Sequence, residues 1–188
     1  TNNLLGVVLI TPDGEEVREL AGDVQQMEHM IQEYLDFVRG ADREEASRVS
    51  VWAMLGAIVS DYHRLNADVT LTSGGDVTTG LRPSGFRRMM HNIIDNALRY
   101  GKHCDIALRI AANYCEIVID DDCPGIPAEM REEVFKPFAR LEASRNVKTG
   151  GVGLGLSIAR DIALAHGGGI SLESSPKQGL RVIIRLPL

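Results

Sequence analysis

Apolar residues recur every three or four positions between Asp23 and Val38, which predicts an amphipathic helix with one narrow apolar stripe. A shorter apolar segment precedes it and ends at the turn-forming sequence Pro12-Asp13-Gly14. Two helices joined by a turn indicate an antiparallel hairpin over residues 1–40. A hairpin with one apolar seam needs a partner surface, which domain packing or dimerisation would supply.

The polar stretch 41–48 predicts a linker, and after it the pattern changes to an alternation of helices and strands. Helical spacing of apolar residues predicts a helix over 50–65 and a second helix opened by Arg82-Pro83-Ser84. Residues 69–71 and 76–78 predict short strands between these helices. We therefore expect a second domain to begin at residue 49.

Strict alternation of apolar and polar residues predicts further strands in the second half of the chain. Residues 106–110 and 115–119 are separated by an Ala-Ala-Asn turn, which indicates an antiparallel hairpin. The segments 170–172 and 180–186 repeat the pattern near the C-terminus. Helices and strands that each have one apolar face predict an α+β fold, a two-layer α/β sandwich over residues 49–188.

The composition is typical of a globular protein, with 44% hydrophobic and 24% charged residues. A net charge of −6 disfavours a general electrostatic attraction to nucleic acid or anionic lipid, so any phosphate must be held locally. Three cysteines without a CxxC pair are typical of free thiols in a reducing compartment. Because no apolar run is long enough to cross a bilayer, we expect a cytoplasmic chain.

The predicted helix that begins near Pro83 carries two asparagines four residues apart, Asn92 and Asn96, which project from nearly the same side. An amide oxygen is a hard neutral ligand that suits Mg²⁺, so Asn96 is the candidate metal ligand. Asn92 is placed to hold a metal-bound water or the phosphate chain, Arg99 to donate to phosphate and Tyr100 to stack. Taken alone, two such asparagines are also typical of a polar helix edge.

Two further segments suggest nucleotide chemistry. The aspartates at 120–122 follow an apolar strand and form either a solvated turn or a site with one inward carboxylate. An inward carboxylate would accept the exocyclic amine of adenine but would meet a carbonyl oxygen in guanine. Glycines at 150–155 directly precede a helical pattern, and their exposed N–H groups predict a phosphate cradle. Between these segments, Phe135 to Phe138 predicts a hydrophobic anchor for a loop over 139–150.

In their order along the chain, these segments resemble the ATP-binding catalytic domain of sensor histidine kinases, which are grouped with gyrase-type and heat-shock chaperone ATPases. Asn92 to Gly101 resembles the N box, Asp121 to Gly125 the first glycine box, Phe135 to Phe138 the F box and Gly151 to Leu156 the second glycine box. The resemblance covers residues 46–188. It implies that ATP lies between the N-box helix and a lid at about 139–150.

The resemblance also implies roles for individual residues. Asn96 would bind Mg²⁺ and Asp121 the adenine amine, while Asn92, Arg99 and Arg145 would act in phosphoryl transfer. The residues expected to contact the nucleotide are Asn92, Asn96, Arg99, Tyr100, Asp121, Gly125, Ile126, Lys148, Gly151, Gly153, Leu154, Gly155 and Leu156.

Asp23 to Gly40 is similar to the second helix of the family's dimerisation and histidine-phosphotransfer hairpin, and the first helix is expected to be truncated. The five histidines, His29, His63, His91, His103 and His166, all lack the acidic residue and proline that follow the family's phosphoacceptor. We interpret His91 as a neighbour of the N box. The expected partners are a phosphoacceptor hairpin of another or fuller-length chain, a response regulator, and a second copy in a homodimer; an inner-membrane anchor is compatible with the full-length protein.

Two positions depart from the family pattern: Cys123 stands where glycine is usual, and Val152 where Thr or Ser is common. Neither changes Asn96 or Asp121, so we expect nucleotide binding to persist. The main prediction is a kinase that transfers the γ-phosphoryl group of ATP-Mg²⁺ to a histidine in two-component signal transduction. The first alternative is a nucleotide-binding pseudo-kinase module, which Cys123 favours; a weaker one is an ATPase or serine kinase, which the helix at 23–40 disfavours.

Overall fold

The computed structural model of the chain describes residues 44–139 and 153–188. The predicted hairpin at 1–40, the first three residues of the predicted linker and the candidate residues Arg145, Lys148 and Gly151 therefore lie outside the described residues. Within the described ranges, no helix combines the length and apolar character needed to cross a membrane.

A five-stranded sheet forms one layer, with the strand order β2-β4-β5-β7-β6. Its strands are β2 (Asp68–Ser73), β4 (His103–Ile110), β5 (Tyr114–Asp121), β6 (Gly169–Ser174) and β7 (Leu180–Pro187). β2 runs parallel to β4, whereas the other neighbours are antiparallel. The predicted hairpin of β4 and β5 is confirmed and occupies the middle of the sheet.

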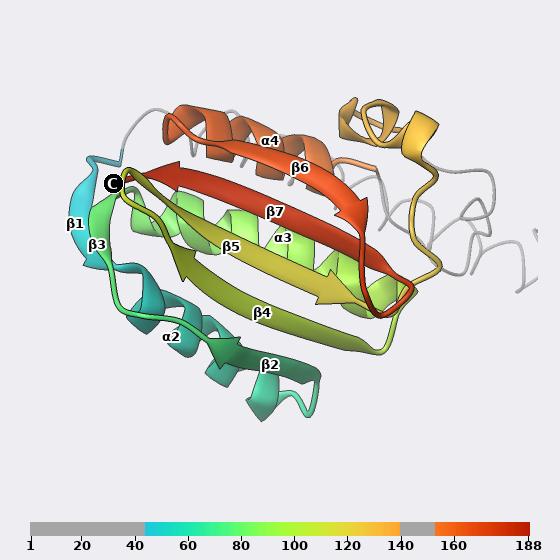
Figure 1. Ribbon diagram of the computed structural model, residues 1–188, viewed down its shortest axis with the longest axis horizontal. Helices are drawn as coiled ribbons and strands as arrows, with labels where there is room; N and C mark the ends of the chain where they lie inside the picture. Colours follow the sequence, from blue (N-terminus) through green and yellow to red (C-terminus); the bar gives the residue numbers. More distant parts are fainter. Residues whose placement is uncertain (1–43, 140–152) are drawn as a thin grey trace, which may run out of the picture. The chain divides into compact units, whose positions relative to one another are not determined.

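The second layer consists of helices α2 (Val51–Arg64), α3 (Pro83–Tyr100) and α4 (Gly155–Ala165). In Figure 1, α3 runs behind β5 and β7, and α4 lies behind β6. Alternate strand residues such as Ile106, Ile117 and Ile184 are fully buried in one continuous core with the apolar faces of the helices. This arrangement confirms the predicted α+β two-layer sandwich. Two 3-10 helices, η1 (Ala128–Met130) and η2 (Glu133–Phe135), follow β5.

A separate two-stranded sheet was not predicted. β1 (Ser47–Ser50) pairs with β3 (Thr78–Leu81), so the extended chain begins inside the stretch predicted as a linker. The predicted strand at 76–78 was placed about two residues too early. Because each strand has only four residues, its formation depends on a partner thirty positions away rather than on a local pattern.

The N-terminus of α3 is capped from outside the helix. Arg82 provides no side-chain cap, and instead the Glu44 carboxylate accepts the N–H of Ser84 at 2.9 Å and the N–H of Gly85 at 3.4 Å. The Ser84 hydroxyl also donates to Glu44. These bonds, chiefly the one from the Ser84 side chain, lower the pKa of Glu44. The helix that carries Asn92 and Asn96 is thus attached to the segment before β1.

Candidate nucleotide site

Three of the predicted motifs meet at one end of the sheet, where β5 ends and β7 begins (Figure 1). α4 begins beside the N box, because a Cβ placed on Gly155 would lie 3.7 Å from the amide oxygen Oδ1 of Asn92. The C-terminus of α3 lies beside the first glycine box, because a Cβ on Gly101 would lie 2.4 Å from a carboxylate oxygen of Asp122. The N box and both described glycine motifs are therefore neighbours in space.

Asp121 is the one of the three aspartates that faces the core. It is buried, with an exposed fraction of 4%, and its oxygen Oδ1 accepts two main-chain N–H groups, from Cys123 at 3.1 Å and from Leu180 at 2.8 Å. Among the residues that the structure describes, Oδ2 has no hydrogen-bond donor. One oxygen thus fixes the carboxylate, while the other is available to a ligand.

The neighbouring aspartates serve the structure instead. Asp120 points to the opposite face of the sheet, where Arg181 on β7 donates to both of its oxygens at 2.8 and 2.7 Å. Asp122 is exposed and accepts the N–H groups of Lys102 and His103 at 2.7 and 3.0 Å, which lower the pKa of its carboxyl. Asp122 therefore connects the end of α3 to the first glycine box.

The backbone of the first glycine box places its left-handed residue at Gly125, which has φ +76°. Cys123 does not have a positive φ, so its side chain causes no backbone strain. The Cys123 side chain is buried, and burial is the main cause that raises the pKa of its thiol to about 11. The position where the family usually has glycine therefore accommodates a cysteine.

The candidate metal and phosphate ligands occupy the half-buried and exposed side of α3. Nδ2 of Asn92 is fully buried and has no hydrogen-bond partner among the described residues. Asn96, one turn later, is half-buried, and Arg99 and Tyr100 are exposed at the end of the helix. A buried amide nitrogen without a partner is uncommon in a folded protein and indicates a position where a ligand or water completes the site.

The start of α4 has the features of an anion cradle. Leu154 at the N-cap has no side-chain cap, and the first main-chain helix bond runs from the N–H of Ile158 to the carbonyl of Leu154 at 2.9 Å. The N–H groups of Gly155 and Leu156 therefore lack helical acceptors, and the helix dipole makes this end positive. Gly153, just before them, has φ +78°.

The F box lies against α4. Phe135 is buried, and the guanidinium of Arg160 on α4 stacks 4.7 Å from the centre of its ring. Phe138 is 63% exposed, and its N–H donates to the carbonyl of Gly153 at 3.0 Å. This bond joins the residues on either side of 140–152. Ile126 is half-buried and packs against the core.

A polar cluster fixes the N-box helix against α2. The Tyr62 hydroxyl donates to Asp95 at 2.6 Å and accepts from Nδ1 of His91 at 2.9 Å. Burial, together with Asp95, raises the pKa of Tyr62. His91 and Asp95 directly precede Asn92 and Asn96, which supports the interpretation of His91 as a structural neighbour of the N box.

The other described histidines also have structural partners. His63 contacts the carbonyl of Val69, His103 pairs with Asp68 and Asp105, and His166 lies between the N–H of Arg82 and the carbonyl of Ile162. These contacts agree with the interpretation that none of the described histidines is the phosphoacceptor.

The sequence did not identify the turn between β6 and β7 as part of this site. A Cβ on Gly179 would lie 2.1 Å from the carbonyl oxygen of Asp121 and 2.6 Å from its Oδ1, so only glycine fits there. Leu180 contributes the N–H that binds Asp121. The only signal in the sequence was a glycine after Pro-Lys-Gln. This pattern predicts a turn, but it does not predict that the turn lies against Asp121.

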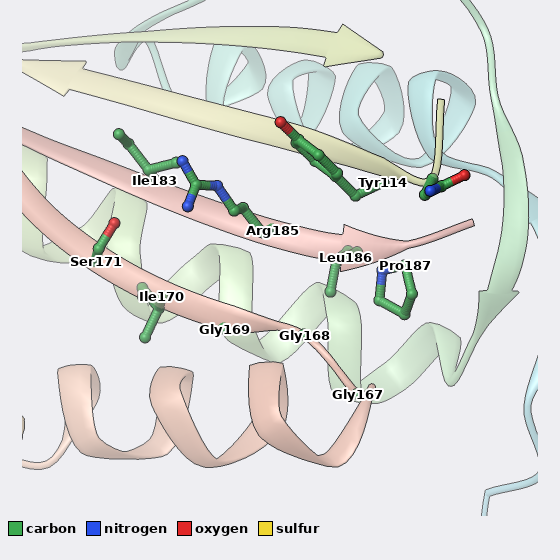
Figure 2. Close-up of a pocket in the computed structure, with 11 residues that line it drawn as sticks. Tyr114, Gly167, Gly168, Gly169, Ile170, Ser171, Ile183, Arg185, Leu186 and Pro187 are labelled. Atoms are coloured by element: carbon green, nitrogen blue, oxygen red, sulfur yellow. The ribbon is translucent and has the colours of Figure 1, made fainter. Parts of the chain in front are cut away.

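A hollow of about 400 Å³ lies elsewhere, between the start of β5, the start of β6 and the end of β7 (Figure 2). Tyr114, Arg185 and the glycines at 167–169 line it. It is at the opposite end of β5 and β7 from Asp121 and contains none of the residues predicted to contact the nucleotide. The hollow is therefore separate from the candidate nucleotide site.

Comparison with known proteins gives consistent results. Residues 82–188 match the family described as histidine kinase-, DNA gyrase B- and HSP90-like ATPases. The chain is 34% identical over 183 residues to the sensor protein RstB of Escherichia coli K12, covering 92% of this chain and 42% of that protein. It is 28% identical over 195 residues to the sensor histidine kinase CpxA of the same organism, covering 98% and 43%. The chain thus spans about two fifths of the length of these relatives.

Solved structures show the same similarity. The ATP binding domain of PrrB from Mycobacterium tuberculosis matches with a TM-score of 0.65 and 29% identity, covering 77% of this chain and 98% of that one. The histidine kinase domain of the E. coli osmosensor EnvZ matches with a TM-score of 0.61 and 27% identity, covering 78% and 91%.

Proposed function

The chain belongs to the family of histidine kinase-, DNA gyrase B- and HSP90-like ATPases, and on this premise we propose that it binds ATP with Mg²⁺ and transfers the γ-phosphoryl group to a histidine. The similarity to sensor histidine kinases supports two-component signal transduction as the setting. The acceptor histidine would belong to a helical hairpin of another or fuller-length chain. A response regulator would receive the phosphoryl group afterwards, and the full-length protein would be a homodimer.

The observation that carries this proposal is the state of Asp121. Its oxygen Oδ1 is held by two main-chain N–H groups, and Oδ2 has no donor among the described residues. A buried acceptor fixed in this way matches the exocyclic amine of adenine and opposes the carbonyl oxygen of guanine. We therefore assign Asp121 to recognition of the base.

The residues on α3 and α4 fit the triphosphate and its metal. Nδ2 of Asn92, buried and unpartnered among the described residues, is a hydrogen-bond donor that suits a phosphate oxygen or a metal-bound water. The amide oxygen of the half-buried Asn96 is a neutral ligand of the type that Mg²⁺ accepts alongside water and phosphate. Mg²⁺, when bound, neutralises phosphate charge during transfer. The N–H groups of Gly155 and Leu156 would bind phosphate oxygens, with the helix dipole adding to the attraction.

The remaining candidates act at the edges of this site. Arg99 would donate to the phosphates, Tyr100 would offer a stacking face, and Gly125 and Ile126 would line the base. Arg145, Lys148 and Gly151 stay predictions because they lie outside the described residues. The backbone at Cys123 has no positive φ, so backbone strain at this departure from the family pattern gives no support to the pseudo-kinase alternative.

Calorimetry with ATP and GTP, with and without Mg²⁺, tests the binding proposal. We expect the parent chain to prefer ATP, and Asp121→Asn to reduce ATP affinity by about tenfold to a hundredfold, since a hydrogen bond to a charged group contributes roughly 1.5–3 kcal/mol. Asp122→Asn is the matched control, because that exposed carboxylate binds only main-chain N–H groups, and it should keep the preference. Asn96→Ala should remove the Mg²⁺-dependent part of the affinity. Equal affinity of the parent chain for ATP and GTP would contradict the assignment.

Phosphoryl transfer is tested by adding a histidine-bearing helical hairpin and γ-labelled ATP. We expect the bond between the γ-phosphorus and the bridging oxygen to break, ADP to leave, and an acid-labile phosphoramidate to form on the hairpin. The chain by itself should bind ATP but retain no label. Tight ATP binding without any transfer would instead support the pseudo-kinase module.

A further inference from the structure

Two hydrogen bonds of Cys123 follow the path of the chain through the first glycine box. Its N–H donates to Oδ1 of Asp121 at 3.1 Å. Its sulfur Sγ accepts the N–H of Gly125 at 3.3 Å. The side chain is 8% exposed and packs at the edge of the core. The cysteine therefore lies between the carboxylate assigned to the base and the left-handed glycine that follows it.

The two bonds have the same form. In each, a side-chain atom accepts the main-chain N–H two residues later, as aspartate and asparagine do in Asx turns. The first turn runs from Asp121 to Cys123 and the second from Cys123 to Gly125, so the turns overlap at the cysteine. Together they define the path of the chain through the box. A glycine at 123 would provide the first N–H but not the second acceptor.

The thiol is suited to this role in its neutral form. Burial raises the pKa of Cys123 to about 11, so the sulfur carries no charge near pH 7. A thiolate would repel the carboxylate of Asp121, whereas the neutral thiol is compatible with it: after burial, a side-chain hydrogen bond with Asp121 is the next cause that raises the pKa of Cys123. The neutral sulfur also accepts the N–H of Gly125, weakly.

We infer that Cys123 is a positioning residue for purine recognition: by holding the N–H of Gly125, its sulfur keeps the N–H of Cys123 on Oδ1 of Asp121 and leaves Oδ2 directed to the base. The inference rests on the proposed ATP binding and extends it. It means that the side chain at position 123 contributes to the discrimination between adenine and other purine bases.

The test compares Cys123→Ala, Cys123→Gly and Cys123→Ser. For each variant, calorimetry measures the affinity for ATP-Mg²⁺ and for inosine triphosphate, which has a carbonyl oxygen in place of the amine. We expect the affinity of the alanine and glycine variants for ATP to fall by about threefold to tenfold. Their affinity for inosine triphosphate should fall less, so the ratio of the two affinities should decrease. The serine variant retains an acceptor and should restore discrimination.

Urea unfolding of each variant separates positioning from packing, because a purely structural loss lowers stability without changing the ratio of the two affinities. Unchanged discrimination in both the alanine and glycine variants would overturn the inference, and so would an equal loss in the serine and alanine variants. A parent chain that binds neither nucleotide would instead overturn the proposed function. Glycine is the usual residue at this position in the family, so that variant keeps the test valid if the alanine variant does not fold.

Discussion

At the scale of single residues, the orientation of Asp121 depends on main-chain groups. A buried carboxylate is tolerated only where donors compensate for its lost hydration, and here the donors are the N–H groups of Cys123 and Leu180. Every substitution except proline leaves both N–H groups in place. The path of the backbone before Leu180 therefore controls where the free oxygen Oδ2 points.

Gly179→Ala tests this dependence. Its Cβ would overlap the carbonyl oxygen and Oδ1 of Asp121, so the backbone of β5 or β7 must move. We expect ATP affinity to fall by about tenfold or more and stability to fall by roughly 1–3 kcal/mol, as is typical of overpacking. Gly169→Ala, in β6 of the same hairpin, is the control because no atom of the part of the chain that the structure describes lies within 4 Å of its Cβ. Calorimetry and urea unfolding measure both effects, and equal behaviour of the two variants would refute the argument.

The sequence alone indicates which of the three aspartates faces inward, but not which groups hold its carboxylate. Alternation places Asp121 on the same face as Ile117 and Ile119, so an inward carboxylate was predictable. The donor from Leu180 was not, because it comes from a strand 59 residues later whose register the local pattern does not determine. For the same reason, the close approach of Gly179 to Asp121 could not be predicted from the sequence.

At the scale of elements, α3 carries the candidate ligands of the nucleotide but lacks a cap of its own. The Glu44 carboxylate supplies the missing acceptor for the first-turn N–H groups of Ser84 and Gly85. A carboxylate at this end also interacts favourably with the helix dipole. The polar composition of 41–48 predicted a linker. The capping role of Glu44 was not predicted, because Glu44 caps a helix forty positions away and this leaves no periodic pattern in the sequence.

Glu44→Gln should therefore lower the stability of the protein by about 0.5–1 kcal/mol at pH 7. Because the pKa of Glu44 is lowered in the folded state, its contribution is present above the ordinary value of 4.5 and is lost as the pH falls through the folded-state pKa. The difference between parent and variant should shrink below about pH 4.5. Urea unfolding from pH 7 to 3 measures it, and Glu45→Gln, at the exposed neighbour, should show no such difference. A constant difference across this range would be inconsistent with a charged cap.

At the scale of the whole molecule, one core joins the sheet to the three helices, and the cysteines at 104, 115 and 123 are all buried free thiols within it. The general fold was predictable because the alternation of strands and the periodicity of helices both have long, regular patterns. The same alternation placed Cys115 with Ile117 and Ile119 on the inward face of β5, whereas Cys123 lies beyond the end of that strand and outside any regular pattern. Their burial has a measurable consequence for stability in alkaline solution.

Burial raises the pKa of Cys104 to about 12 and that of Cys123 to about 11, compared with an ordinary value of 9.0. Below pH 9 the folded and unfolded states both hold these protons, so the thiols contribute their full stabilisation. As the pH rises further, the unfolded chain releases its protons first, and this stabilisation is lost as the pH approaches the folded-state pKa values. We expect each of these two thiols to steepen the fall in unfolding free energy by about 1.4 kcal/mol per pH unit between about pH 9 and 11.

Urea unfolding of the parent chain and of Cys104→Ala, at several pH values under reducing conditions, isolates this effect. The variant loses packing, which lowers its unfolding free energy at every pH. The loss of one buried thiol instead changes the slope of unfolding free energy against pH above about pH 9. Groups that do not interact with Cys104 contribute equally in both proteins, so their contribution cancels in the difference. We therefore expect the two stability curves to converge as the pH rises from 9 to 11, because only the parent has a proton at Cys104 to release on unfolding. Parallel curves over that range would show that the core does not hold the Cys104 thiol in its neutral form.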